Sequence, residues 1–223
     1  MAIDPCTEYG LALAAEDFVP VVLAGLGALA LADACGRRVP SVRAGAMIGS
    51  VLITLGGLGK ATWKVLVAAE PCHEVPILEQ ALFPCLAFGF AALAWSVVAL
   101  SRGTATSPAR FAAVPVLGAA GAFAVGALWP MLVVAAVGAV VVGITASRHA
   151  FVSGLSGAGW LYIAYVVGTL VLPPLAARPD QSEGLQWIEQ LTNSTVQACF
   201  LFGALALRRH LSPTPTQTAG ASL

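Results

Sequence analysis

The chain has 223 residues, of which 58% are hydrophobic and 10% are charged, and its mean hydropathy is +0.86. These values lie well outside the range of soluble globular proteins, so the composition predicts an all-α, polytopic integral membrane protein. The formal net charge is zero and the basic residues form no patch, which argues against a nucleic-acid partner.

The hydrophobic residues fall into runs of about 17 to 25 residues, long enough to cross a bilayer as helices. The first run follows an acidic segment without the basic region of a signal peptide, so we expect it to remain as an anchor. The run over 111–145 is about 35 residues, roughly 50 Å as one helix, so we divide it near Trp129–Pro130 into a hairpin. The sixth span is expected to end at Pro173–Pro174. The predicted single domain, residues 1–211, is a seven-helix bundle with spans at about 18–34, 42–67, 77–100, 111–127, 129–146, 157–175 and 187–207.

Every second connection between these spans is rich in arginine. Arginines follow the first, third, fifth and seventh spans, whereas the opposite connections are acidic and hold Arg178 as their only basic residue. Because cytoplasmic loops are enriched in basic residues, the alternation predicts an outside N-terminus and a cytoplasmic C-terminus. It would fail if 111–145 were one span. Residues 212–223 are predicted to form a disordered cytoplasmic tail, and the membrane is expected to be a bacterial plasma membrane.

The only two lysines of the chain, Lys60 and Lys64, lie inside the second span. They are four residues apart and therefore share one helix face, and the preceding glycines at 56, 57 and 59 would let a neighbouring helix approach closely. Counting along the helix places Lys60 in the outer leaflet and Lys64 at its lip. Because a lysine in the hydrocarbon region is costly without a partner, we predict that Lys60 faces the bundle interior.

A polar stripe marks the seventh span. Glu189, Asn193 and Gln197 recur every four residues and descend from the outer surface toward mid-membrane. Glu79 begins the third span at the same side, so Glu79, Glu189 or Asn193 is the expected partner of Lys60. Carboxylates and lysines at one depth neutralise each other, which favours a polar pocket that opens outward. The predicted ligand-binding residues are Lys60, Lys64, Glu79, Glu189, Asn193 and Gln197.

Each of these residues also has an ordinary structural interpretation. Lys64 can extend its side chain to the lipid headgroups, and Lys60 can do so less easily. Glu16, Asp17 and Glu79 can be acidic residues favoured at helix N-termini by the helix dipole. The amides of the stripe can serve as hydrogen bonds between helices.

The cysteines predict one covalent link. Cys6 and Cys72 both fall on the outer side, where a disulfide is stable, so a Cys6–Cys72 bond is possible across the pocket mouth. The cysteines at 35, 85 and 199 are expected to be packing residues. No metal site is expected, because the three histidines are dispersed among the loops.

Several functional classes are argued against by the sequence. It contains no phosphate loop, dinucleotide glycine motif or nucleophile elbow, and no cofactor is expected. The span count and orientation match those of the rhodopsins, but the seventh span has no lysine for a retinal Schiff base.

Two functional hypotheses remain beside a purely structural membrane subunit. In the first, the pocket binds a small or amphiphilic, anionic ligand from the outer leaflet, as a receptor, carrier or lipid-binding protein would. In the second, the same residues support proton-coupled transport or metal-independent acid-base catalysis. A low dielectric can shift the pKa values of lysine and glutamate toward neutral pH, where both can exchange protons. The sequence leans away from an enzyme and assigns no catalytic residue. The expected partners are the lipid bilayer and the ligand.

Overall fold

The computed structural model describes residues 10–69, 71–176 and 182–212, and this part of the chain contains helices and no strand. The predicted all-α class is therefore confirmed for the described residues. The helical elements are α2 (Leu11–Glu16), α3 (Phe18–Arg38), the 3₁₀ turn η1 (Pro40–Val42), α4 (Arg43–Ala68), α5 (Pro76–Gln80), α6 (Leu82–Arg102), α7 (Ala109–Val125), α8 (Trp129–Val152), α9 (Ser156–Ala176) and α10 (Glu183–His210).

Five helical segments of the described chain are long and apolar enough to cross a membrane, which indicates an integral membrane protein. α7 is apolar but only 17 residues long. α10 has 28 residues, but it carries the polar stripe and is not among the five. The five segments are Leu11–Arg38, Pro40–Ala68, Pro76–Arg102, Trp129–Val152 and Ser156–Leu175.

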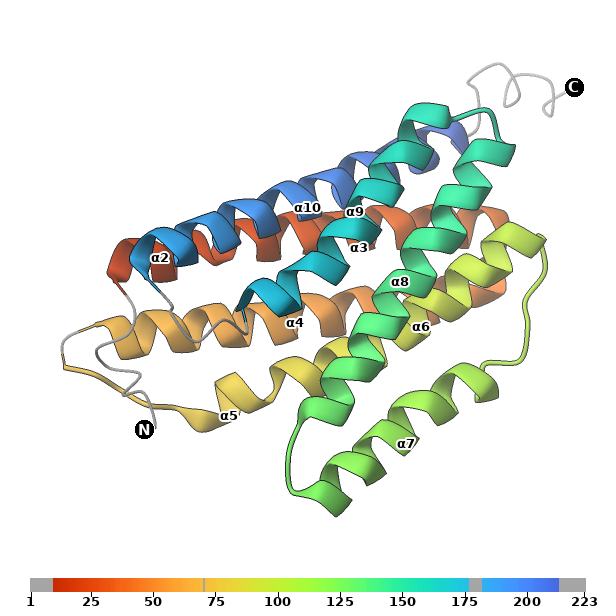
Figure 1. Ribbon diagram of the computed structural model, residues 1–223. Coiled ribbons are helices and arrows are strands. Elements are labelled where there is room, and N and C mark those ends of the chain that lie inside the picture. Colours follow the sequence, from red (N-terminus) through yellow and green to blue (C-terminus); the bar gives the residue numbers. More distant parts are fainter. Residues whose placement is uncertain (1–9, 70, 177–181, 213–223) are drawn as a thin grey trace, which may run out of the picture.

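The long helices form a closed ring in which α3 packs on α4, α4 on α6, α6 on α8, α8 on α9, α9 on α10 and α10 on α3. The core combines small and branched side chains with Tyr162, Tyr165 and Phe200. The rings of Tyr165 and Phe200 stack with their centroids 4.8 Å apart, which ties α9 to α10. α7 lies at the margin of the bundle and packs on α6 and α8 (Figure 1).

Glycines allow the close approach of α4 to its neighbours. A Cβ atom at Gly49 would lie 2.7 Å from the carbonyl oxygen of Gly89, and one at Gly56 would lie 2.7 Å from the Cβ of Cys85. Both distances are shorter than van der Waals contact, so the backbones of α4 and α6 touch there directly. The predicted close approach just before the lysines is confirmed at Gly56.

The helix boundaries confirm the predicted break and lie close to the bounds predicted for the third and sixth spans. Gly126 adopts a left-handed conformation after α7, and α8 begins at Trp129 with Pro130 in its first turn, so the break near Trp129–Pro130 is confirmed. The third span, predicted at about 77–100, falls within the helical segment Pro76–Arg102, in which Ala81 separates α5 from α6. α9, Ser156–Ala176, agrees with the sixth span predicted at about 157–175, and Pro173–Pro174 lie in its last turn.

The first span also begins earlier than predicted, because α2 precedes α3 with only Asp17 between them. Asp17 keeps a right-handed helical conformation, so the two helices together extend over Leu11–Arg38. The predicted start at residue 18 was therefore wrong. As a consequence, Glu16 and Asp17 lie along a membrane-length helix and not at its N-terminus.

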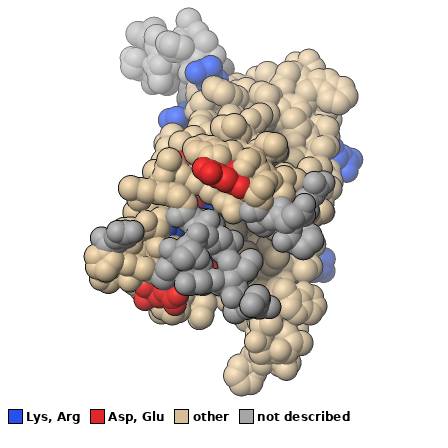
Figure 2. Space-filling model, turned by 60° about the vertical axis from the view of Figure 1, so that its left-hand side comes forward, with Lys and Arg blue, Asp and Glu red and all other residues tan. Residues whose placement is uncertain are grey.

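Charged residues are concentrated at the two ends of the ring. At one end, Asp33 accepts hydrogen bonds from Arg37 at 3.0 Å and from Arg208 at 2.8 Å, and Arg38 donates to the carbonyl oxygen of Leu100 at 3.1 Å. The opposite end carries α2 and α5, and acidic side chains are visible on the surface there, among mostly uncharged residues (Figure 2). We call these the arginine end and the lysine end. The tail predicted from residue 212 lies outside the described residues except for Ser212.

Candidate functional site

A cavity of about 330 Å³ lies between α3, α4, α6 and α10, toward the lysine end of the ring. Its apolar wall comes from α3 and α6, and its polar wall from α4 and α10. The cavity is at the lower limit of typical small-molecule sites, which measure about 300 to 1,000 Å³. Five of the six predicted ligand-binding residues line it: Lys60, Lys64, Glu189, Asn193 and Gln197.

Lys60 has the kind of partner that the sequence predicts. Its Nζ lies 2.8 Å from Oε1 of Glu79, and it also lies 4.0 Å from the ring centroid of Trp63. The side chains of Lys60 and Glu79 remain 25% and 43% exposed, so water can reach this ion pair. Glu79 belongs to the short helix α5 and does not line the cavity, so it neutralises Lys60 from outside the cavity wall.

The side chain of Lys64 is more buried within the bundle than that of Lys60, which the sequence did not predict. Its Nζ lies 2.5 Å from Oδ2 of Asp17, and the two side chains are only 15% and 12% exposed. The reason is that the early helix α2 passes above this part of α4 and covers Lys64. Extension of Lys64 to the headgroups is therefore not what the structure shows.

Two residues of α10 complete a polar network with the α2–α3 junction. Gln190 is buried and donates from Nε2 to Oδ1 of Asp17. One turn further along, the hydroxyl of Ser194 donates to Oε1 of Glu16 at 2.6 Å. The other carboxylate oxygen of Glu16 is buried without a hydrogen-bond partner among the described residues. The network connects three helices through side chains alone.

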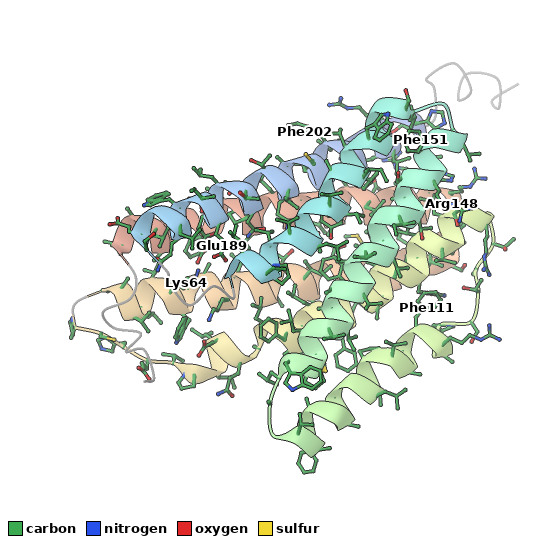
Figure 3. All side chains as sticks on the ribbon, in the orientation of Figure 1. Lys64, Phe111, Arg148, Phe151, Glu189 and Phe202 are labelled. Carbon is green, nitrogen blue, oxygen red and sulfur yellow. The ribbon has the colours of Figure 1, made fainter. Side chains whose placement is uncertain are left out.

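All three residues of the polar stripe of α10 line the cavity, and two of them are hydrogen-bonded to each other. Nε2 of Gln197 donates to Oδ1 of Asn193 at 3.3 Å. Figure 3 shows Lys64 on α4 and Glu189 on α10 at the same end of the bundle, on facing helices, and both side chains line the cavity. The cavity wall thus carries two ammonium groups, from Lys60 and Lys64, and two carboxylates, from Asp17 and Glu189.

The sequence analysis missed the most buried part of this network. Asp17 was placed at the outer end of the first span, Gln190 at that of the seventh and Ser194 within the polar stripe, but none of them was among the predicted ligand-binding residues. The missed signal is the apolar segment over 11–15, which continues the first hydrophobic run past two acidic residues. Gln190 and Ser194 also repeat at four residues, one position along from the predicted stripe.

The described residues contain no group of three or more histidine, cysteine or acidic side chains that could hold a metal ion. Cys35, Cys85 and Cys199 are free thiols, whereas Cys72 is disulfide-bonded. Cys6 lies outside the described residues, so the predicted Cys6–Cys72 pairing stays a prediction.

Comparisons of the chain with protein-family profiles, curated protein sequences and solved structures found no match.

Proposed function

We propose that the protein binds a small or amphiphilic ligand in the cavity at the lysine end, within the outer half of the membrane. One observation carries the proposal: ionisable and amide side chains from α4, α10 and the α2–α3 junction converge on a cavity whose remaining wall is apolar. Polar groups held against an apolar wall suit a molecule with a polar head and a hydrocarbon body. A receptor, carrier or lipid-binding role would use the same arrangement.

The proposed topology is a seven-span bundle with the lysine end outside and the arginine end cytoplasmic, in a plasma membrane. It adds α7 and α10 to the five apolar segments and rests on the positive-inside rule. Single cysteines introduced at Gly10, Ser107 and Ala127 test it by labelling with an impermeant maleimide. Gly10 and Ala127 should react from outside and Ser107 only after permeabilisation. Labelling of Ser107 and Ala127 from one side would remove α7 as a span.

The ligand's anionic group is proposed to replace Glu79 as the partner of Lys60. Of the two lysines on the cavity wall, Lys60 has the more exposed ion pair, and exposed pairs are worth only about 0 to 1 kcal/mol. Separating Lys64 from Asp17 would leave a buried charge uncompensated and would cost far more. An anion that enters the cavity can therefore pair with Lys60 at a small cost in free energy.

Binding of laurate, a simple anionic amphiphile, tests this proposal with purified protein in phosphatidylcholine nanodiscs. We expect saturable thermal stabilisation by laurate but not by dodecanol. Lys60→Met should abolish the laurate effect, and Glu79→Gln should strengthen it because the competing carboxylate is neutralised. Equal responses to laurate and dodecanol in all three proteins would contradict the anionic ligand.

Acid-base or proton-coupled chemistry is the second candidate, and the polar network at the lysine end supports it. Asp17 contacts both Lys64 and Gln190, while Glu16 has a buried oxygen with no hydrogen-bond partner among the described residues. Such groups can exchange protons along a chain of contacts. Lys60→Arg separates the candidates: it keeps the charge needed by an anion site but removes a titratable amine. Proteoliposomes with a trapped pH dye would lose proton flux only under the second candidate.

A further inference from the structure

A second polar cavity lies at the arginine end, far from the site described above. It has a volume of about 380 Å³ and lies between the ends of α6 and α8. Arg102, Arg148 and His149 are its cationic or titratable wall residues, with the hydroxyls of Ser101 and Thr145 beside them. Arg148 is labelled in Figure 3 near the end of α8, facing outward from the ring. His149 has a buried Nε2 without a hydrogen-bond partner among the described residues.

An adjoining cavity of about 550 Å³ extends this surface toward α7. It shares Val98 and Arg102 with the first cavity and adds Arg110. The three arginines at 102, 110 and 148 are exposed, and neither cavity wall contains a carboxylate. The ion pairs of this end, in the described part of the chain, are made by Asp33 with Arg37 and Arg208. The positive charge around Arg102 is therefore not neutralised by the cavity walls.

An apolar cleft continues from these cavities along the helices. It measures about 140 Å³, lies between α6, α7 and α8, and shares Phe111 and Val114 with the α7 cavity. Its wall is almost entirely apolar, and Val137 on α8 is 54% exposed. The cleft lies where α7 packs on α6 and α8 at the margin of the ring. A cationic surface thus passes directly into a hydrocarbon-lined groove.

We propose that the ends of α6, α7 and α8 bind an anionic phospholipid of the cytoplasmic leaflet. Arg102, Arg110 and Arg148 hold the phosphate, since the guanidinium group matches phosphate geometry with paired hydrogen bonds. One acyl chain occupies the cleft beside Val137. Basic pockets between membrane helices on the cytoplasmic side are suited to anionic headgroups. The proposal depends on the membrane location of the chain but not on the cavity at the lysine end.

Native mass spectrometry of the delipidated full chain in detergent tests the proposal with three probes: phosphatidylglycerol, phosphatidylcholine and inorganic phosphate. We expect phosphatidylglycerol to be retained about tenfold more than phosphatidylcholine. An arginine that contacts the anionic headgroup is expected to contribute about fivefold in affinity. Arg148→Gln should therefore lower phosphatidylglycerol binding about fivefold, and Arg148→Lys should restore most of it. The matched control Arg209→Gln also removes one exposed arginine at this end, outside both cavities, and should leave binding unchanged.

The acyl chain has its own test, because a free anion would meet the same arginines. Val137→Trp fills the cleft without touching the arginines, and it should lower phosphatidylglycerol binding several-fold. Equal retention of the two lipids, or an equal loss in Arg148→Gln and Arg209→Gln, would overturn the headgroup site. Inorganic phosphate binding as tightly as phosphatidylglycerol, with no effect of Val137→Trp, would overturn the lipid and leave an anion site. Thermal unfolding of each variant checks that it folds.

Discussion

The two ends of the helical ring hold their charges in opposite ways. At the lysine end, charges from different helices pair inside the bundle, and the Lys64–Asp17 pair is only 15% and 12% exposed. At the arginine end, the paired groups Arg37 and Arg208 are 33% and 46% exposed, and Arg102 and Arg148 project from the surface. Charge at the lysine end is therefore largely buried between helices, whereas charge at the arginine end stays more exposed, even where Arg208 on α10 meets Asp33 on α3.

Energetics follow from that difference. A buried ion pair contributes little net stability when intact, because desolvation offsets attraction, but losing one partner is strongly destabilising. An exposed ion pair contributes little to stability when intact, and losing one of its partners costs little. We therefore expect variants at the lysine end to lower the free energy of unfolding more than equivalent variants at the arginine end.

The largest expected effect comes from breaking the Lys64–Asp17 pair. Lys64→Met leaves the carboxylate of Asp17 buried with Gln190 as its remaining partner, so the free energy of unfolding should fall by about 3 kcal/mol. Denaturation by sodium dodecyl sulfate in mixed micelles, followed by circular dichroism, measures it. Adding Asp17→Asn to Lys64→Met should recover much of the loss, because no unpaired charge then remains. A double variant as unstable as the sum of the singles would show that the pair does not couple.

The next effect is steric and tests whether the lysine end depends on close helix approach. Gly56→Leu places a side chain where a single Cβ already lies 2.7 Å from Cys85, so we expect a loss of about 1 to 3 kcal/mol. Gly126→Ala is less crowded, since no atom lies within 4 Å of its Cβ position, although its positive φ adds a smaller strain. The same denaturation assay compares them, and a milder effect at Gly56 would contradict the close α4–α6 contact.

Some features of the fold and of the site could be predicted from the sequence, and the reasons are physical. Apolar run lengths placed most of the helices, because a membrane helix needs a fixed length of apolar residues. The lysines and the Glu79 partner were predictable because an intramembrane charge needs compensation. The Trp129–Pro130 break followed from length and from proline's preference for a first helical turn.

Residues whose importance depends on the third dimension were not predictable. Asp17 is buried where α2 extends the first helix, and the sequence signal of α2, the apolar segment over 11–15, is too short to predict a helix by itself. Glu79 meets Lys60 from the short helix α5, whose separation from α6 at Ala81 the sequence did not predict. Pairing between α2 and α10 depends on the closure of the helical ring, which brings the two ends of the chain together. Ser194 and Glu16, for example, are 178 positions apart in the sequence.

A smaller effect is expected for the other lysine, which compares two ion pairs on one helix. Lys60→Met should lower the free energy of unfolding by about 1 kcal/mol, because Glu79 is 43% exposed and can be hydrated once its partner is lost. The same micelle titration measures it beside Lys64→Met. If Lys60→Met were the more destabilising of the two, the order of burial, with Lys64 more buried than Lys60, would be wrong.

The smallest effect is expected at the arginine end, from Asp33→Asn. Asp33 meets Arg37 and Arg208, so its removal breaks two contacts, yet both arginines are exposed and each pair is worth about 0.2 to 1 kcal/mol. Salt distinguishes this end from the other, because the Debye length falls from about 10 Å at 0.1 M to about 3 Å at 1 M, so high salt screens exposed ion pairs but acts much less on buried ones. Raising the salt concentration to about 1 M should therefore erase the difference between Asp33→Asn and the unsubstituted chain, while the deficit of Lys64→Met persists. An Asp33→Asn deficit that survives high salt would mean that charge at both ends is used in the same way, and that the surface role assigned to the arginine end does not hold.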